Sequence, residues 1–535
     1  MRFIDGLCEG ETIRNVYLCK GKRSAETRNG KPYDNLILQD KTGTLDGKVW
    51  DPNSQGIADY DEKDFIEVFG DVINYNGNLQ LNIRQIRKAE EGEYNPADYM
   101  PTTDKSVDGM YEELTAYIRQ ISNKYLRQVL EFYYIKDEAF IKKFKAHSAA
   151  KTVHHGFIGG LMEHTLGVTR LCDYMSKAYP VINSAAFYLD DFPSPVPSGD
   201  ATYIKRDYGM SIADFYSKVW WPDLTKLAER YGIRFTGVMI ENYGDDTKDA
   251  PVRQKDESHF SYFGGLLLKQ NGEIGYHGYN HQPLVLPNTD YGDEYAYHQW
   301  PNRKAVVASL RELIAFQKSV LPAATASVYV PPSNILSKEG RQTIGRDVPE
   351  IRTIASTYLP SDSKLPYVQE FGVADDGIVE APRIVSGGMV GDYMRLAAES
   401  ELNMHFVSTH FMHPDDMLDP DRGAKEGWAV YRKGLENYLD WLEASAPSIR
   451  MQTGTECASA VQRFSGLTVK MRESANEWEF DLGNFKDQAW LLLRANHGTP
   501  GRIQGGSMIR MTGNLYLIKT TDSTVHVERK AGGAA

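Results

Sequence analysis

An apolar run that ends abruptly in two adjacent carboxylates constrains this chain more than any other feature. Residues 186–189 (Ala-Phe-Tyr-Leu) have the composition of a buried strand, Asp190 and Asp191 follow at once, and a Pro-rich turn comes next. Two acids side by side at the end of a buried strand are costly unless a cation lies between them. A divalent metal ion is the usual cation in such places. The run therefore predicts a strand whose end holds a metal ion.

Two further stretches place imidazoles after apolar runs. His277 and His281 stand four residues apart, and His410 and His413 follow another strand-like run. One carboxylate and two neutral imidazoles, with positions left open for water, make a catalytic rather than a structural set of ligands. We therefore predict a hydrolase that depends on a divalent metal ion, with Zn²⁺ as the first choice and Co²⁺, Mn²⁺ or Ni²⁺ as alternatives.

Apolar strands alternate with helical stretches between residues 184 and 447. Such alternation indicates an α/β barrel, in which the chemistry sits at the carboxyl ends of the strands. The paired aspartates and both histidine pairs come just after predicted strands. Their shared position is the reason to expect that they form one site.

The first 88 residues alternate short β-rich runs with turn signals. We expect five strands, at residues 12–19, 34–39, 44–50, 65–74 and 78–86, and a small closed barrel of the OB type. Aromatic and basic side chains on such a barrel suit single-stranded RNA or DNA, because rings stack on bases and cations lie near phosphates. The candidates are Tyr33, Lys41, Lys48, Trp50, Tyr75 and Arg84. The alternative is that Trp50 belongs to the core and the lysines are only solvated.

A polar linker, residues 89–108, leads to a helical segment that we expect over residues 109–183. Within it, residues 152–168 read Thr-Val-His-His-Gly-Phe-Ile-Gly-Gly-Leu-Met-Glu-His-Thr-Leu-Gly-Val. Together with the barrel hairpin at residues 40–51, this stretch resembles the YhaM-type 3′-to-5′ exoribonucleases, which join an OB barrel to an HD-superfamily domain. The resemblance implies that His164 corresponds to the first metal ligand of the HD site.

The other metal ligands of an HD site have no counterpart in this sequence. In the family a His-Asp pair on a later helix supplies the next two ligands, and no His-Asp dipeptide follows in this chain. One ligand cannot hold the metal that would activate water for phosphodiester attack. We therefore expect a truncated HD-like segment in which His164 is a remnant, without exoribonuclease activity, beside a barrel that can still bind nucleic acid.

From residue 184 to 535 the chain resembles the NodB-type polysaccharide deacetylases, and more closely a set of uncharacterised bacterial proteins related to them. The resemblance rests on the paired aspartates, the His277–His281 pair and the strand that leads to His410 and His413. It implies that Asp190 is the general base and that Asp191, His277 and His281 hold the metal. His410 or His413 would then protonate the leaving group.

One departure from the family pattern concerns the residue that orients the base. The family has an Arg two residues before a Pro, where this chain has Tyr329, and Arg383 is our candidate for the same role. We expect removal of acyl groups from a glycan by metal-activated water. Two alternatives stay open. The first is a nucleic-acid-binding protein in which the front barrel is the working part and the rest of the chain is a catalytically inactive scaffold. The second is a metal-free glycosidase-like barrel that uses two carboxylates, for instance Asp191 and Glu380.

Residues 448–535 show short alternating runs that are typical of a small β-sandwich. We thus expect a multidomain fusion: an OB-type β-barrel, a short truncated HD-like helical segment, a central deacetylase-type α/β barrel and a C-terminal β-sandwich. A net charge of −12 argues against wholesale coating of nucleic acid. The first residues lack the pattern of a signal peptide, and no apolar run approaches about 18 residues. The sequence therefore predicts a cytoplasmic protein without a membrane span, whereas deacetylase-like relatives usually act outside the cytoplasm.

Overall fold

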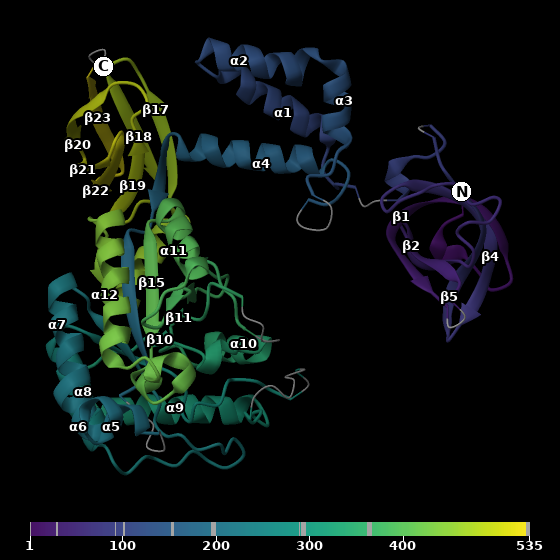
Figure 1. The fold of residues 1–535 in the computed structure, drawn as a ribbon. Coiled ribbons are helices and arrows are strands. Elements are labelled where there is room, and N and C mark those ends of the chain that lie inside the picture. Colours follow the sequence, from purple (N-terminus) through teal and green to yellow (C-terminus); the bar gives the residue numbers. More distant parts are fainter. Residues whose placement is uncertain are drawn as a thin grey trace. The chain divides into compact units, whose positions relative to one another are not determined.

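A computed structural model gives the fold of the 535-residue chain. It describes residues 2–27, 30–90, 92–99, 102–150, 155–193, 200–287, 289, 296–360 and 366–530. The chain divides into two compact units, Met1–Tyr174 and Met175–Ala535 (Figure 1). It contains a closed β-barrel, helices and several further sheets, which confirms the prediction of a multidomain protein.

The first unit begins with a closed five-stranded barrel of strand order β1-β2-β3-β5-β4. Its side chains alternate between a buried and a solvent-facing side, as β2 shows. The alternation of apolar and polar residues in the sequence therefore gives each strand one face toward the barrel interior and one face toward solvent. Tyr17, Leu38 and Val68 are among the fully buried side chains inside it. Four of the strands cover their predicted ranges and run longer, whereas β3 begins and ends one residue earlier than predicted. The strands are β1 (Thr12–Glu26), β2 (Pro32–Asp40), β3 (Gly43–Val49), β4 (Phe65–Tyr75) and β5 (Asn78–Lys88), after the short turn η1 (Ile4–Gly6).

Helices follow the barrel in the first unit. Ser106, Asn123 and Asp137 each accept a hydrogen bond from the first turn of the helix that follows them, which fixes where three of the helices begin. Their inward faces share a small apolar core that includes Leu114 and Phe144. The elements are η2 (Pro96–Asp98), α1 (Val107–Gln120), α2 (Lys124–Glu131), the single π turn η3 (Phe132–Lys136), α3 (Glu138–Ala146) and α4 (Gly160–Met175).

The second unit is built on a largely parallel sheet whose central strand, β7, is buried at every residue. Strands neighbour one another in the order β11-β10-β9-β8-β7-β15. Residues 379–386 pair with β11 at their start and with β15 at their end. This segment therefore connects the two strands at the ends of that order. The strands are β7 (Ser184–Phe192), β8 (Phe235–Met239), β9 (Glu273–Tyr276), β10 (Val328–Tyr329), β11 (Thr353–Ile354), β12 (Gly372–Val373), β13 (Val379–Glu380), β14 (Val385–Ser386), β15 (Val407–Met412) and β16 (Met451–Gln452).

Helices alternate with these strands along the chain and cover the sheet, which explains why the strands read as continuous apolar runs (Figure 1). The α-helices are α5 (Thr202–Tyr208), α6 (Ile212–Phe215), α7 (Trp221–Tyr231), α8 (Ser258–Lys269), α9 (Arg303–Val320), α10 (Lys338–Asp347), α11 (Asp392–Met404), α12 (Trp428–Ser445) and α13 (Gly454–Gly466). Shorter turns are η4 (Tyr216–Trp220), η5 (Pro332–Asn334), η6 (Pro414–Met417) and η7 (Pro420–Ala424). Among the described residues, no helix combines the length and the apolarity needed to cross a membrane.

Two four-stranded sheets complete the second unit, in the orders β17-β18-β23-β20 and β21-β22-β19-β6. Their shared core includes Trp478, Leu491 and Val525. The strands are β6 (Ala178–Val181), β17 (Thr468–Glu473), β18 (Glu477–Gly483), β19 (Ala489–Arg494), β20 (Thr499–Gln504), β21 (Gly506–Thr512), β22 (Leu515–Thr520) and β23 (Thr524–Lys530).

The structure divides the chain at other residues than the sequence predicted. β6 precedes the predicted boundary at 183/184, yet it pairs with β19 as an edge strand, a position in which Pro180 is tolerated. Beyond the predicted boundary at 447/448, β16 pairs with β7 and α13 packs on the same strand. Residues 178–183 therefore belong to the second unit, and residues 451–466 belong to its parallel sheet.

Candidate metal centre

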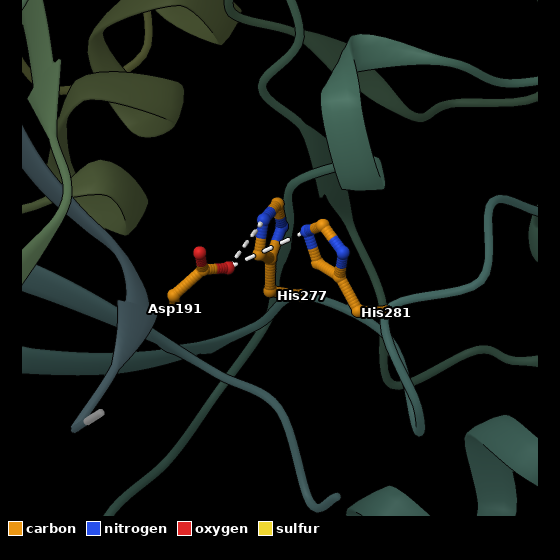
Figure 2. A group of neighbouring side chains, drawn as sticks. All are labelled: Asp191, His277 and His281. Carbon is orange, nitrogen blue, oxygen red and sulfur yellow. Dashed lines mark ion pairs between the residues drawn. The ribbon is translucent and has the colours of Figure 1, made fainter. Parts of the chain in front are cut away.

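Three predicted ligands meet at the carboxyl edge of the parallel sheet. Asp191 lies at the end of β7, and His277 and His281 lie in the loop after β9. The Nε2 atoms of His277 and His281 are 3.3 and 3.4 Å from Oδ1 of Asp191 (Figure 2). The three ligand atoms all lie within 4.8 Å of one another. Because neighbouring parallel strands end at the same edge, residues far apart in the sequence converge here.

The backbone aims two of these side chains by an uncommon conformation. Asp191 and His281 have φ angles of 53° and 57°, in the left-handed region that side chains other than Gly adopt rarely. Such positions are held only where the surrounding structure enforces them, and they gather at functional sites. The edge of the sheet is therefore shaped around these two side chains.

The chemistry of the three side chains fits a cation. Nδ1 of His277 lies 2.8 Å from the carbonyl oxygen of Val330 and must donate its hydrogen to it, so the lone pair of the neutral ring lies on Nε2. That lone pair faces Oδ1 of Asp191, which is buried and accepts no hydrogen bond from the described residues. Burial lowers the pKa of His281 to about 4, so this ring is neutral at physiological pH. Lone pairs that converge without a hydrogen between them repel, and a divalent cation would remove the repulsion.

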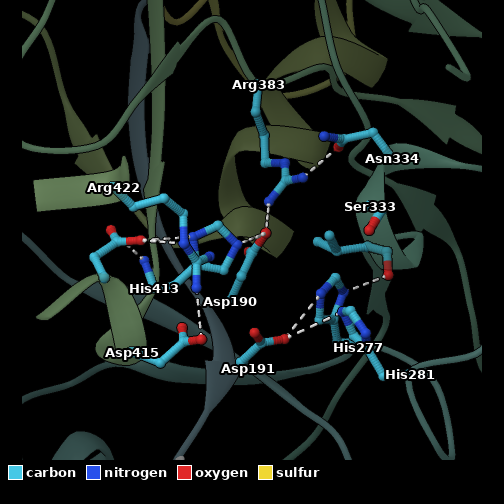
Figure 3. A network of polar contacts seen from close by, with 12 residues as sticks. Asp190, Asp191, His277, His281, Ser333, Asn334, Arg383, His413, Asp415 and Arg422 are labelled. Atoms are coloured by element: carbon cyan, nitrogen blue, oxygen red, sulfur yellow. Dashed lines mark hydrogen bonds and ion pairs between the residues drawn. The ribbon is translucent and has the colours of Figure 1, made fainter. Parts of the chain in front are cut away.

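Asp190 is held by the guanidinium of Arg383 (Figure 3). Both side chains are almost completely buried. Arg383 also donates to Oδ1 of Asn334 at 2.5 Å and to the carbonyl oxygen of Ser356 at 3.3 Å, so its position is fixed from three sides. Tyr329, which stands where the deacetylase pattern has its Arg, is buried on β10, and burial raises its pKa. The structure thus brings Arg383, and not the residue at position 329, to the carboxylate of Asp190.

His413 forms the opposite wall of the site. Its Nε2 lies 3.8 Å from Oδ2 of Asp190, and its Nδ1 lies 3.4 Å from Oδ1 of Asp416. The other oxygen of Asp416, Oδ2, accepts a hydrogen bond from Tyr431 at 2.5 Å. Burial lowers the pKa of His413, but Asp416, Asp190 and Asp191 outweigh burial and raise the pKa to about 9. His413 is therefore protonated at neutral pH and able to give a proton.

His410, the other predicted acid, does not reach the site. It is fully buried, its Nε2 lies 2.8 Å from the carbonyl oxygen of Gly387, and its ring stacks on Tyr438 at 5.6 Å. Successive residues of a strand point to opposite faces, so Phe411 faces the site and His410 faces the helix behind it. Of the two histidines offered by the sequence, only His413 belongs to the site.

The side chains surround an open cavity of about 420 Å³. Tyr243 and Tyr297 flank His281, and Arg422 donates to Asp415 at 2.6 Å on the far side. Sequence reasoning did not predict several lining residues: Tyr243, Tyr297, Ser333, Asn334, Phe411, Asp415 and Arg422. For Asp415 and Asp416 the sequence does give an indication, because these two acids come directly after the candidate ligand or acid His413 in the His-Pro-Asp-Asp stretch at residues 413–416.

Glu380 lies outside this cavity. Its carboxylate accepts hydrogen bonds from Arg341, at 2.9 Å, and from Tyr367 and Gln369, and it lines a different surface cavity. The carboxylate pair of Asp191 and Glu380, which the glycosidase alternative requires, is therefore not brought together.

Three of the six residues predicted to bind nucleic acid contact one another on the barrel. The rings of Tyr33 and Trp50 stack with centroids 5.4 Å apart, and Nζ of Lys48 lies 5.3 Å from the centre of Tyr33. Trp50 is 51% exposed, so it does not belong to the barrel core. Lys41 and Arg84 instead form ion pairs with Asp98 and Asp71, and Tyr75 is exposed at the end of β4.

His164, which the resemblance to YhaM-type proteins suggested as an HD ligand, lies on α4 with its ring 5.4 Å from that of His155. In the described part of the chain it belongs to neither group of side chains whose spacing suits a metal ion. The second such group is Glu477, Glu479 and His526, which lie on β18 and β23.

The fold and the site define a multidomain protein with a five-stranded β-barrel and a separate candidate metal centre on a parallel sheet. The model of a family described as uncharacterised proteins conserved in bacteria (DUF2194) matches residues 163–517. The chain belongs to this family.

Among curated proteins, the chain is similar to 3′-5′ exoribonuclease YhaM. The protein from Listeria welshimeri is 33% identical over 184 residues, which are 34% of this chain and 56% of that protein. The protein from Bacillus subtilis is 31% identical over 180 residues, again 34% of this chain and 56% of that protein. The chain thus spans about half the length of the curated relatives it matches.

Among solved structures, a candidate polysaccharide deacetylase from Mycobacterium smegmatis matches with 17% identity and a TM-score of 0.33, over 52% of this chain and 89% of that one. The second OB-fold domain of replication protein A from Methanococcus maripaludis matches with 19% identity and a TM-score of 0.15, over 17% of this chain and 98% of that one. The comparisons confirm the resemblance to YhaM-type proteins over the first third of the chain and the resemblance of the remainder to a set of uncharacterised bacterial proteins.

Proposed function

We propose that the second unit is a metal-dependent hydrolase that removes acyl groups from a glycan. The observation that carries the proposal is the convergence of Asp191, His277 and His281 on one point beside the buried pair of Asp190 and Arg383. One carboxylate and two neutral imidazoles leave a divalent ion with net positive charge and open positions. Such an ion, when bound, polarises an acyl carbonyl and makes water acidic near neutral pH.

The side chains around the ligands have complementary roles. Asp190 accepts the proton of the attacking water, and Arg383 orients its carboxylate by a hydrogen bond. His413 lies across from them with its pKa raised to about 9, so it gives a proton to the leaving nitrogen or oxygen. Asp416 holds the ring of His413 in place, and Tyr243 and Tyr297 suit contact with the faces of a sugar.

Metal analysis combined with acetate release tests this proposal. The purified chain is expected to hold stoichiometric metal and to release acetate from at least one substrate in a panel of N-acetylated and O-acetylated oligosaccharides. Asp191→Asn and His277→Ala should lose both the metal and the activity. His298→Ala is the matched control, because this exposed histidine contacts the carbonyl oxygen of Asp245 instead of the site. A chain that releases acetate without metal would refute the proposed chemistry.

Single-stranded nucleic acid is a second candidate ligand, bound by the first unit. The stacked and exposed pair of Tyr33 and Trp50, with Lys48 beside it, supports this function, since rings stack on bases and ammonium groups approach phosphates. The similarity to YhaM over a third of the chain supports it too. RNA cleavage is not proposed, because the sequence lacks the His-Asp pair of an HD site.

Fluorescence anisotropy with a labelled single-stranded RNA tests the second candidate. Binding should weaken at high salt, because it releases counterions, and it should be lost in the Tyr33→Ala/Trp50→Ala variant. Lys48→Ala should weaken binding more than Arg14→Ala, which removes an equal charge from a residue already paired with Glu67. Equal binding by all of these variants would exclude this face of the barrel.

A further inference from the structure

The short turn η5 contributes two neighbouring side chains to the wall of the candidate metal centre. Ser333 and Asn334 have φ angles of 50° and 58°, and both line the cavity. Within the described ranges they are the one consecutive pair of residues other than Gly whose backbone lies in the left-handed region. Such a conformation costs free energy and persists where the surrounding structure enforces it. The turn is therefore held by its surroundings, and its two side chains contact different parts of the site.

Ser333 is connected to the candidate metal ligand His281 through the hydroxyl of Tyr297. The hydroxyl oxygens of Ser333 and Tyr297 are 2.7 Å apart, and that of Tyr297 lies 3.5 Å from Nδ1 of His281. When Nε2 of the neutral ring faces a cation, the one hydrogen of the ring is on Nδ1 and needs an acceptor. The oxygen of Tyr297 can accept it, because the hydrogen of Tyr297 can go on to Oγ of Ser333. For His277 the carbonyl oxygen of Val330 has the same role.

Asn334 is connected to the candidate base Asp190 through Arg383. Its side-chain oxygen accepts a hydrogen bond from Arg383 at 2.5 Å, and Arg383 donates in turn to Asp190 (Figure 3). The carbonyl oxygen of Asn334 accepts the backbone N–H of Tyr367 at 2.8 Å, which fixes the turn itself. Two neighbouring residues of one turn thus support the metal ligand and the base.

The same turn packs against the loop that carries the two histidines. Gly278 of that loop has a φ angle of 96°, and a Cβ at this position would lie 3.2 Å from Cγ of Pro332. The lack of a side chain at Gly278 therefore allows the loop to approach the turn closely. This contact places η5 directly beside the segment from His277 to His281.

From these contacts we propose that Tyr297 and Ser333 are positioning residues for the metal ligand His281, and that η5 is one support for both this ligand and the base. The inference rests on the proposed function, since it assigns a role to groups that contact the proposed ligands. Residues that hold the second nitrogen of a histidine ligand change metal affinity by about 10- to 100-fold. The role of Tyr297 belongs to its hydroxyl and is separate from any contact that its ring makes with a sugar.

Competition with a chromophoric chelator measures the affinity of the full chain for Zn²⁺ and tests the positioning role. Tyr297→Phe keeps the ring and should weaken Zn²⁺ binding by about 10- to 100-fold. Ser333→Gly should weaken it too, and Gly adopts the φ angle of this position without strain. The double variant should bind no more weakly than Tyr297→Phe alone, because both changes break the same chain of hydrogen bonds. Tyr367→Phe is the matched control, since its hydroxyl donates to Glu380 outside the cavity, and it should bind Zn²⁺ as the wild type does.

Asn334→Gly tests the second half of the proposal. It should leave the Zn²⁺ affinity unchanged and lower kcat for acetate release with little change in KM, because it acts on the orientation of the base. Circular dichroism shows whether each variant is folded. Wild-type Zn²⁺ affinity in Tyr297→Phe, or losses that add in the double variant, would overturn the positioning role. A loss of Zn²⁺ in Asn334→Gly as large as in Tyr297→Phe would overturn the division of roles within η5.

The same measurements separate this inference from the proposed function. A wild type that binds no Zn²⁺ would overturn both. A wild type that binds Zn²⁺ but releases no acetate would overturn the proposed function alone, because the effect of Tyr297→Phe on Zn²⁺ affinity does not depend on the reaction.

Discussion

Removal of the charge of Arg383 should destabilise the second unit and impair the proposed site at once. The side chains of Arg383 and Asp190 are 1% and 2% exposed. Arg383→Met keeps most of the volume but leaves the carboxylate of Asp190 buried without its cation. Breaking a buried ion pair from one side costs about 3–5 kcal/mol. The free energy of unfolding of a domain is about 5–15 kcal/mol, so this substitution should remove a large fraction of it.

A double-mutant cycle measures whether the two side chains act as a unit. Urea unfolding should show a large loss for Arg383→Met, a smaller one for Asp190→Asn, and a loss for the double variant that is well below their sum, with a coupling of about 2 kcal/mol. Arg341→Met is the control, since Arg341 pairs with Asp376 and Glu380 outside the cavity. It should cost stability but leave acetate release unchanged. Single losses that simply add in the double variant would refute the reasoning.

Two further predictions concern residues outside the ligand set. Burial lowers the pKa of His410 from 6.5 to about 4, so its contribution to stability is complete above pH 6.5 and is lost as the pH falls toward 4, because the unfolded chain takes up the proton first. The free energy of unfolding should fall by about 3 kcal/mol in total over this pH range. His410→Asn should flatten the dependence of urea unfolding on pH over this range, and an unchanged slope would contradict the assignment. Gly340→Ala should cost about 1–3 kcal/mol, because its Cβ would lie 2.1 Å from the carbonyl oxygen of Leu284. Gly265→Ala, where a Cβ meets nothing within 4 Å, should be tolerated, and equal losses in urea unfolding would count against this steric explanation.

The barrel was predictable because its information is local. Alternation of apolar and polar residues sets the faces of each strand, and turn residues set the strand ends, so five strands were expected where β1 to β5 lie. The helix α13 and the edge strand β6 were not expected where they are. β6 is only four residues long, and its partner β19 lies more than 300 residues further along the chain, so no local pattern assigns it to a sheet.

The candidate site was predictable in part for the same reason. Asp191, His277 and His281 each follow an apolar run, and strands of a parallel sheet present their ends at one edge, so these residues could be paired from the sequence. The choice between His410 and His413 was not available, because it depends on which face of β15 points inward. The ends of a strand can be read from the sequence more easily than its orientation.

By itself, the amino-acid sequence determined most of the elements, with α13 and β6 as exceptions, and it determined which chemical groups stand at the ends of the strands that form the site. The tertiary structure decided which of those groups meet. Arg383 and Asp190 are 193 residues apart, and their contact exists because residues 379–386 join β11 to β15 and so bring both side chains to the same edge of the sheet. Periodicity acts over a few residues of one segment, whereas this contact depends on the pairing of all the strands between them.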